Sequence, residues 1–268
     1  MRKKVKTFRP TAFAFPYLTV TIVFVIVPLL LILVYAFRGA DGSFTLNHFK
    51  DVFEKGYFSK IIDTVGIAAV STVICLLIAY PVAFILASSP FNKMAILALL
   101  FIIPMWINFM LRIFALNSLL GIIGIKEGYM AAVIGMVYDF FPYMLLPIYT
   151  VLLNMDKSYL EASKDLGANS FKTFTKITLP LSLPGVISGI SMMFMPIFSS
   201  YAITDTMGGA ETSVIGANIA TLFDGNADNY GLGSALSFVL LLIVLVVVFL
   251  STSLSGRSAK VKKVGKVS

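Results

Sequence analysis

Residues 156–180 read DKSYLEASKDLGANSFKTFTKITLP and form the long polar connection between two apolar runs of the chain. The first half, Ser158–Leu166, consists largely of good helix formers, and Gly167 follows it at the position of a left-handed helix cap. Apolar side chains recur in this half at helical spacing. The pattern predicts a short amphipathic helix that lies at a membrane face and ends at Gly167.

The second half of this connection predicts another short helix. Asn169 or Ser170 is suited to cap its start, and the helix is expected to continue to about Ile177. Pro180 and Pro184 are expected to end it and to lead into the next apolar run. The connection is therefore predicted to be two short helices joined by a glycine turn.

The 268-residue chain as a whole has the composition of a membrane protein. It is 58% hydrophobic and 13% charged, with a mean hydropathy of +0.93, and a soluble domain of this length needs more charge to cover its surface. Six apolar runs are long enough to cross a bilayer as helices. They are expected at about 12–37, 61–87, 94–118, 131–153, 185–204 and 231–254. We therefore predict an all-α protein in which 1–268 is a single transmembrane domain.

The basic residues predict the orientation. Fifteen of the 21 lysines and arginines lie in the segments that are cytoplasmic when both termini are inside, and five lie in the outer loops. Cytoplasmic loops of membrane proteins carry an excess of lysine and arginine. Both termini and the 156–180 connection are therefore expected in the cytoplasm.

Several classes of function are disfavoured by the residues. The basic residues flank apolar runs, which fits membrane topology better than nucleic-acid binding. The single Cys75 lies in an apolar run and the single His48 in a polar segment that we expect to be a loop, so neither a catalytic pair nor a metal cluster is expected. The sequence has no Gly-rich phosphate-binding motif with a following Lys, and nucleotide chemistry is assigned to a partner.

The 156–180 connection also resembles a known motif. Its fixed points are Glu161-Ala162-Ser163, then Gly167 after three residues, then Ile177-x-Leu179-Pro180 after nine more. This spacing resembles the Glu-Ala-Ala loop of the permease subunits of binding-protein-dependent ATP-binding-cassette (ABC) importers, with Ser163 in place of the second alanine. The resemblance implies a type I importer fold in which 156–180, the coupling loop, docks into a groove on an ATPase. The alternative is a helix-turn-helix that only links two spans.

The resemblance implies a set of partners. It implies a dimer of ATP-binding subunits, a second permease subunit, an extracytoplasmic substrate-binding protein and a location in a bacterial plasma membrane. The chain itself would bind no cofactor and catalyse no bond chemistry, whereas the partner ATPase would use ATP and Mg²⁺. Glu161 would be the anchor of the coupling loop, and Gly167 would permit its turn.

Other stretches resemble the spermidine/putrescine permeases of the PotB type. They are FTLNHF at 44–49, YPVAFILA at 80–87, PMWINFMLR at 104–112 and DTMGGA at 205–210. Each stretch alone is weak, but their order and spacing along one chain favour this subfamily. The resemblance implies that the substrate is a polyamine.

A polyamine path needs carboxylates and aromatic faces that hold ammonium groups without trapping them. The candidates share this chemistry or lie beside it: Trp106, Asn108, Tyr138, Asp139, Tyr143, Tyr201 and Asp205. Each has a structural alternative. Asp139 can instead neutralise Arg112, Asp205 can cap a helix or loop, and Trp106 can anchor the chain at the membrane interface.

Three alternative functions stay open at this level. The same machine could carry another solute, such as iron, sulfate or a sugar. An ion-coupled secondary transporter would need inverted repeats and ion ligands at the membrane midplane, and neither is evident in the sequence. An intramembrane enzyme would need a catalytic partner for Asp139, and none is evident.

Overall fold

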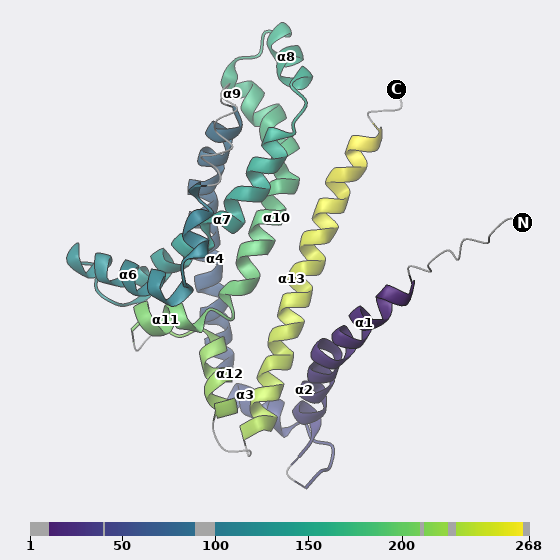
Figure 1. The fold of residues 1–268 in the computed structure, drawn as a ribbon, viewed down its shortest axis with the longest axis vertical. Helices are drawn as coiled ribbons and strands as arrows, with labels where there is room; N and C mark the ends of the chain where they lie inside the picture. The colour runs from purple at the N-terminus through teal and green to yellow at the C-terminus, as the bar shows by residue number, and fades with distance from the viewer. Residues whose placement is uncertain (1–10, 40, 89–99, 210–211, 225–228, 265–268) are drawn as a thin grey trace, which may run out of the picture. The chain divides into compact units, whose positions relative to one another are not determined.

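The structure is a computed structural model that describes residues 11–39, 41–88, 100–209, 212–224 and 229–264. Within these ranges the chain forms helices, turns and bends, with one isolated antiparallel bridge between Arg38 and Phe44 (Figure 1). It divides into two compact units, the first formed by 1–56 with 219–241 and the second by 57–218 with 242–268. All the candidate residues lie in the second unit, and the single domain expected over 1–268 stays a prediction.

Among the described residues, five helical stretches are long and apolar enough to cross a membrane. They are Phe15–Phe37, Tyr57–Ser88, Tyr129–Leu153, Ser170–Ile197 and Tyr230–Phe249. They contain α1 (Thr11–Thr21), the π-helical η1 (Ile22–Ile26), α2 (Val27–Phe37), α4 (Tyr57–Ser88), α7 (Tyr129–Leu153), α10 (Leu179–Ile197) and α13 (Tyr230–Val264). The predicted runs 12–37, 61–87, 131–153 and 231–254 lie within these helices, so these four predictions are confirmed.

The third predicted run, 94–118, is wrong as a single helix. Part of it lies outside the described residues, and the described part contains a 3₁₀ turn, η2 (Ile103–Trp106), followed by the helix α6 (Phe109–Ile122). Asn108 separates the two because its side-chain oxygen accepts hydrogen bonds from two N–H groups of the first turn of α6. With 14 residues, α6 is about 21 Å long and shorter than a bilayer core of roughly 30 Å.

The fifth predicted run, 185–204, is wrong at both ends. One continuous helical stretch runs from Ser170 to Ile197 through α9 (Ser170–Thr173), the π-helical η3 (Phe174–Thr178) and α10. The chain then turns, and a separate helix, α11 (Tyr201–Met207), follows.

Pro180 and Pro184 do not end the helix, which corrects the second prediction for this segment. In the π-helical turn the N–H of Leu179 donates to the carbonyl of Phe174, five residues earlier. Pro180 directly follows this widened turn, whose shifted hydrogen-bond register accommodates its missing N–H, and Pro184 lies inside α10. The helix therefore continues through both prolines.

In the second unit, α10 and α7 approach closely where α10 carries glycines. A Cβ on Gly185 would lie 2.8 Å from the carbonyl oxygen of Pro147, and one on Gly189 would lie 3.0 Å from that of Met144. Small residues four apart let two membrane helices bring their backbones together. Motion of α10 is consequently tied to motion of α7.

The first unit is held by aromatic side chains. The ring of Phe37, at the end of α2, lies 5.0 Å from Phe49 on α3 (Asn47–Glu54) and 5.8 Å from Phe238 on α13, measured between ring centroids. His48 is also on α3 and not in a loop as predicted. Its Nε2 lies 3.1 Å from the carbonyl oxygen of Arg38, and its ring fills the space beside Gly231.

Candidate functional site

The first half of the coupling loop is the helix α8 (Ser158–Asp165), and it ends as predicted at Gly167. Gly167 has a φ of +72°, in the left-handed region. Its N–H donates to the carbonyl of Lys164 at 2.8 Å, and the N–H of Ala168 donates to that of Ser163 at 3.0 Å. This pair of bonds is a Schellman cap, which fixes the direction in which the chain leaves α8.

Ser163 joins the two halves of the loop. Its side chain is buried, and its hydroxyl lies 2.8 Å from the hydroxyl of Thr173 at the end of α9. Asn169 caps α9 as predicted, because its side-chain oxygen accepts a hydrogen bond from the N–H of Lys172 at 2.8 Å. The small side chain at Ser163 therefore permits close packing, and its hydroxyl adds a hydrogen bond.

The coupling loop also contacts α4 through an aromatic residue that the sequence analysis missed. Phe174, in η3, makes edge-to-face contacts with Tyr80 and Phe84, at centroid distances of 5.9 and 5.5 Å. The hydroxyl of Tyr80 lies 2.8 Å from that of Ser182 on α10. The sequence shows apolar residues within 170–177. It does not show which way their side chains face, because that depends on the π-helical turn, which the hydrophobic periodicity does not predict.

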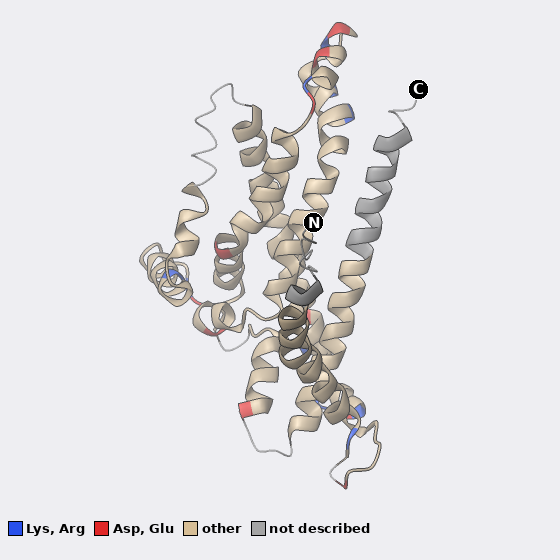
Figure 2. Cartoon of the chain, turned by 45° about the vertical axis from the view of Figure 1, so that its right-hand side comes forward, with Lys and Arg blue, Asp and Glu red and all other residues tan. Residues whose placement is uncertain are grey.

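The outer surface of the loop carries apolar side chains that the described residues do not cover. Leu166 is 87% exposed and Phe171 is 75% exposed, on either side of the Gly167 turn. Glu161 is exposed as well. Its side-chain carboxylate has no hydrogen-bond or ionic partner in the described part of the chain. Charged residues gather along the ribbon at α8, whereas the long helices consist mostly of uncharged residues (Figure 2).

The remaining coupling-loop candidates lie along the path from α8 to α10. Ala162 is exposed on α8, Ile177 is half-buried in η3, and Leu179 and Pro180 are exposed at the start of α10. On α8 the buried residue is Ser163, and the predicted apolar face is largely exposed. An exposed apolar face beside a free carboxylate is suited to bind another protein surface.

Asp139 lies deep in α7 and forms an ion pair with Arg112 of α6, as one of the two interpretations from sequence required. The side chains are 6% and 9% exposed. Arg112 also donates from Nη1 to the carbonyl of Pro104 at 2.9 Å. This carbonyl oxygen also accepts a hydrogen bond from the N–H of Ile107 at 3.1 Å, so Arg112 supplies its second donor and Asp139 neutralises Arg112.

The other path candidates stand apart from this pair. Trp106 is 88% exposed on η2, and Asn108 is the cap of α6. Tyr138 and Tyr143 are 42% and 36% exposed on α7. Their roles in a substrate path stay predictions.

Tyr201 and Asp205 lie on α11, one helical turn apart, and both are exposed. No ionic or hydrogen-bond partner of the Asp205 side chain occurs among the described residues. The helix α11 packs on α7 where a Cβ on Gly135 would lie 2.7 Å from the sulfur of Met207. Asp205 is therefore an available carboxylate beside an aromatic ring.

The family of binding-protein-dependent transport system inner membrane components matches residues 6–260 of the chain. The chain belongs to this family. The permease is 31% identical over 251 residues to the spermidine/putrescine transport system permease protein PotB of Haemophilus influenzae, covering 85% of the chain and 87% of that protein. It is 30% identical over 246 residues to PotB of Escherichia coli K12, covering 83% and 89%.

Solved structures share the fold of the permease. A chain of a bacterial ABC transporter involved in the import of the acidic polysaccharide alginate matches with a TM-score of 0.73 and 16% identity, covering 92% of the permease and 94% of that chain. A chain of the MetNI methionine ABC transporter, in an inward-facing conformation, matches with a TM-score of 0.61 and 17% identity, covering 75% and 95%. The permease is therefore an all-α membrane protein with the fold of an ABC importer permease and not an enzyme.

Proposed function

We propose that the permease carries polyamines such as spermidine and putrescine across the membrane as part of an ATP-driven importer. The observation that carries this proposal is its identity of 30–31% to PotB permeases over more than four fifths of the chain. The substrate would arrive from an extracytoplasmic binding protein. A second permease subunit and a dimer of ATP-binding subunits would complete the machine.

The coupling loop would face the cytoplasm and dock on the ATPase, which binds the ATP and Mg²⁺. The excess of basic residues in the loop and at both termini supports this orientation. Exposed Leu166 and Phe171 would enter a groove of the partner, and the free Glu161 carboxylate would pair with a basic or hydroxyl group there. The Schellman cap and the bond from Ser163 to Thr173 support a rigid loop.

Alternating access would follow from how the loop is connected. Because α9, η3 and α10 are continuous, a displacement of the docked loop moves α10 as a rod. The close approach at Gly185 and Gly189 passes this motion to α7, and Phe174 passes it to α4. ATP-driven closure of the partner would thereby rearrange three spans together.

The substrate's ammonium groups would meet aromatic faces and an available carboxylate. Asp205 with Tyr201 is the better candidate for a cation contact, since the described ion pairs leave Asp205 free whereas Asp139 is held by Arg112. Exposed Trp106, Tyr138 and Tyr143 would supply further aromatic faces, with Asn108 beside them.

The test uses the assembled transporter in nanodiscs with its binding protein. ATP hydrolysis should rise when spermidine is added to the binding protein, and labelled sulfate or glucose should not be taken up into proteoliposomes. A hydrolysis rate with spermidine no higher than with binding protein alone would contradict the polyamine assignment. Uptake that persists without any ATPase subunit would contradict the ATP-driven mechanism.

A further inference from the structure

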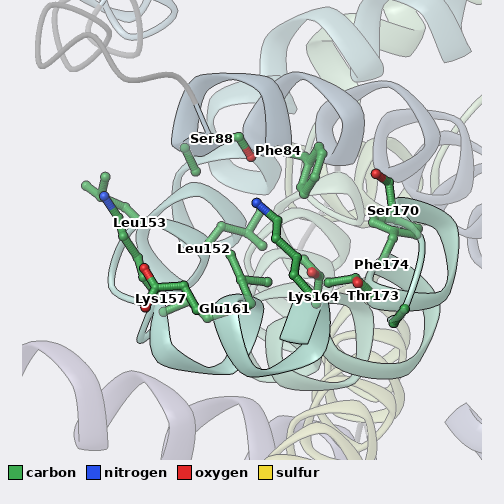
Figure 3. Close-up of a pocket in the computed structure, with 15 residues that line it drawn as sticks. Phe84, Ser88, Leu152, Leu153, Lys157, Glu161, Lys164, Ser170, Thr173 and Phe174 are labelled. Atoms are coloured by element: carbon green, nitrogen blue, oxygen red, sulfur yellow. The ribbon is translucent and has the colours of Figure 1, made fainter. Parts of the chain in front are cut away.

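A hollow of about 460 Å³ lies under the coupling loop, where three parts of the second unit meet. Its lining comes from the end of α4, the end of α7, and the segment from α8 through η3. Figure 3 shows the side chains around it, with Lys164 extending across the lining toward Phe84 and with Lys157 and Glu161 on the α8 side. The hollow has the size of a small-molecule site.

The charged groups of the lining have no ionic partner within the described part of the chain. Lys157, Glu161 and Lys164 have spacings that favour ion pairs on a helix, yet no pair within 4 Å forms between them. On α3, by contrast, Lys50 pairs with Glu54 and Lys55 with Asp51 at the same spacing. Two ammonium groups and one carboxylate thus leave the hollow with a net positive charge and two free donors.

The remainder of the lining is amphipathic. Phe84, Leu152 and Leu153 form an apolar wall on the side of the spans, whereas Ser88 and Ser170 contribute hydroxyl groups to the lining. A soluble anion would interact with the charged groups of the lining and would leave the apolar wall uncovered. A phospholipid uses both, with its phosphate near the ammonium groups and its acyl chains along the apolar side chains.

We propose that this hollow binds the headgroup of an anionic phospholipid from the cytoplasmic leaflet. The proposal rests on the cytoplasmic orientation of the coupling loop given under the proposed function. Lys157 and Lys164 contact the phosphate, and Glu161 stays free for the ATPase. Because the lining joins the loop to the ends of α4 and α7, an occupied hollow fixes the loop against both spans and raises the coupling of hydrolysis to transport.

The experiment places the full-length permease in phosphatidylcholine nanodiscs that contain a photoactivatable phosphatidylglycerol. The wild-type protein should be labelled in the peptides that contain Phe84–Ser88 or Leu152–Met155. The variant Lys157→Gln/Lys164→Gln should lose about thirtyfold of this labelling, since each of the two lysines near an anionic lipid contributes about 1 kcal/mol. The control Lys172→Gln/Lys176→Gln makes the same change of charge in the same loop, outside the lining, and should label as the wild type does.

Equal labelling in both variants would overturn the proposal, as would labelling suppressed equally well by millimolar inorganic phosphate, which would make the hollow a soluble-anion site. A second measurement uses the assembled transporter with binding protein and spermidine. Relative to the same protein in phosphatidylcholine alone, phosphatidylglycerol should raise stimulated hydrolysis in the wild type but not in Lys157→Gln/Lys164→Gln. If stimulation is absent in every lipid while the labelling pattern holds, the proposed function fails and the lipid site stands.

Discussion

At the scale of the residue, the buried charge pair is the feature that most needs a physical explanation. Charge in a bilayer is costly, and an isolated Arg112 at 9% exposure would be strongly destabilising. At the helix break before α6, the carbonyl of Pro104 accepts one hydrogen bond from the N–H of Ile107 and a second from Arg112. Arg112 supplies the second donor and Asp139 supplies the counter-charge, so neither charge requires a substrate to be explained.

This explanation predicts the outcome of removing the pair. Asp139→Leu leaves a buried guanidinium unpaired and should destabilise the permease by about 3 kcal/mol. The double variant Arg112→Met/Asp139→Leu removes both charges and should be more stable than either single variant, because the Pro104 carbonyl keeps the hydrogen bond from the N–H of Ile107. Thermal unfolding in detergent measures this, and additive losses in the double variant would contradict the pairing. Transport by a well-folded double variant would further exclude Asp139 from substrate binding.

Removing the hydroxyl of Ser163 should have a smaller effect on stability, and this effect can be assigned to one hydrogen bond. Ser163→Ala and Thr173→Val each remove one hydroxyl of the 2.8 Å pair and should cost about 1 kcal/mol. The double variant should cost no more than the larger single loss, because both changes remove the same bond. A double-mutant cycle on thermal stability checks this, with fully additive losses as the contrary result.

At the scale of the element, the sequence predicted what depends on composition and missed what depends on hydrogen-bond register. Apolar length alone located four spans, and Gly167 and Asn169 marked the caps of α8 and α9, because these residues have specific backbone roles. The continuous helix through Pro180 could not be predicted, since nothing in the pattern distinguishes a widened π-helical turn from a helix end. The break at Asn108 was hidden by apolar residues on both sides.

Because α7 and α10 are in close contact, we predict that alanine substitutions at two different glycines differ strongly in their effect on stability. Gly189→Ala places a methyl group 3.0 Å from the carbonyl oxygen of Met144 and should cost about 2 kcal/mol through overpacking. Gly66, inside α4, has open space around the same position, so Gly66→Ala should be neutral or slightly stabilising. Thermal stability of both variants, measured in the same detergent, tests the difference. Equal effects would mean that the close approach does not hold in the membrane.

At the scale of the whole molecule, the sequence contains apolar spans and the coupling loop, and it has no phosphate-binding motif. We therefore expect the energy for transport to come from a partner ATPase, and we propose that it enters at the coupling loop, where charged residues gather around α8 (Figure 2). The sequence led to this assignment because the spacing of Glu161, Gly167 and Pro180 is specific. The substrate path is less predictable from sequence, because exposed aromatic residues such as Trp106 also suit lipid or another subunit.

The proposed coupling role of Glu161 gives a prediction that distinguishes an effect on docking from an effect on folding stability. Glu161→Lys reverses the charge of an exposed residue without a described partner, so thermal stability should change by less than about 0.5 kcal/mol. Hydrolysis by the assembled transporter should then lose its response to binding protein and spermidine, and uptake should fall, because the reversed charge opposes the basic or hydroxyl group expected on the ATPase. Asp224→Lys makes the same change on an exposed residue at the end of α12 (Ile215–Asp224) and should leave uptake intact. Uptake by Glu161→Lys equal to that of this control would remove Glu161 from the coupling mechanism and leave the apolar residues Leu166 and Phe171 to carry the docking.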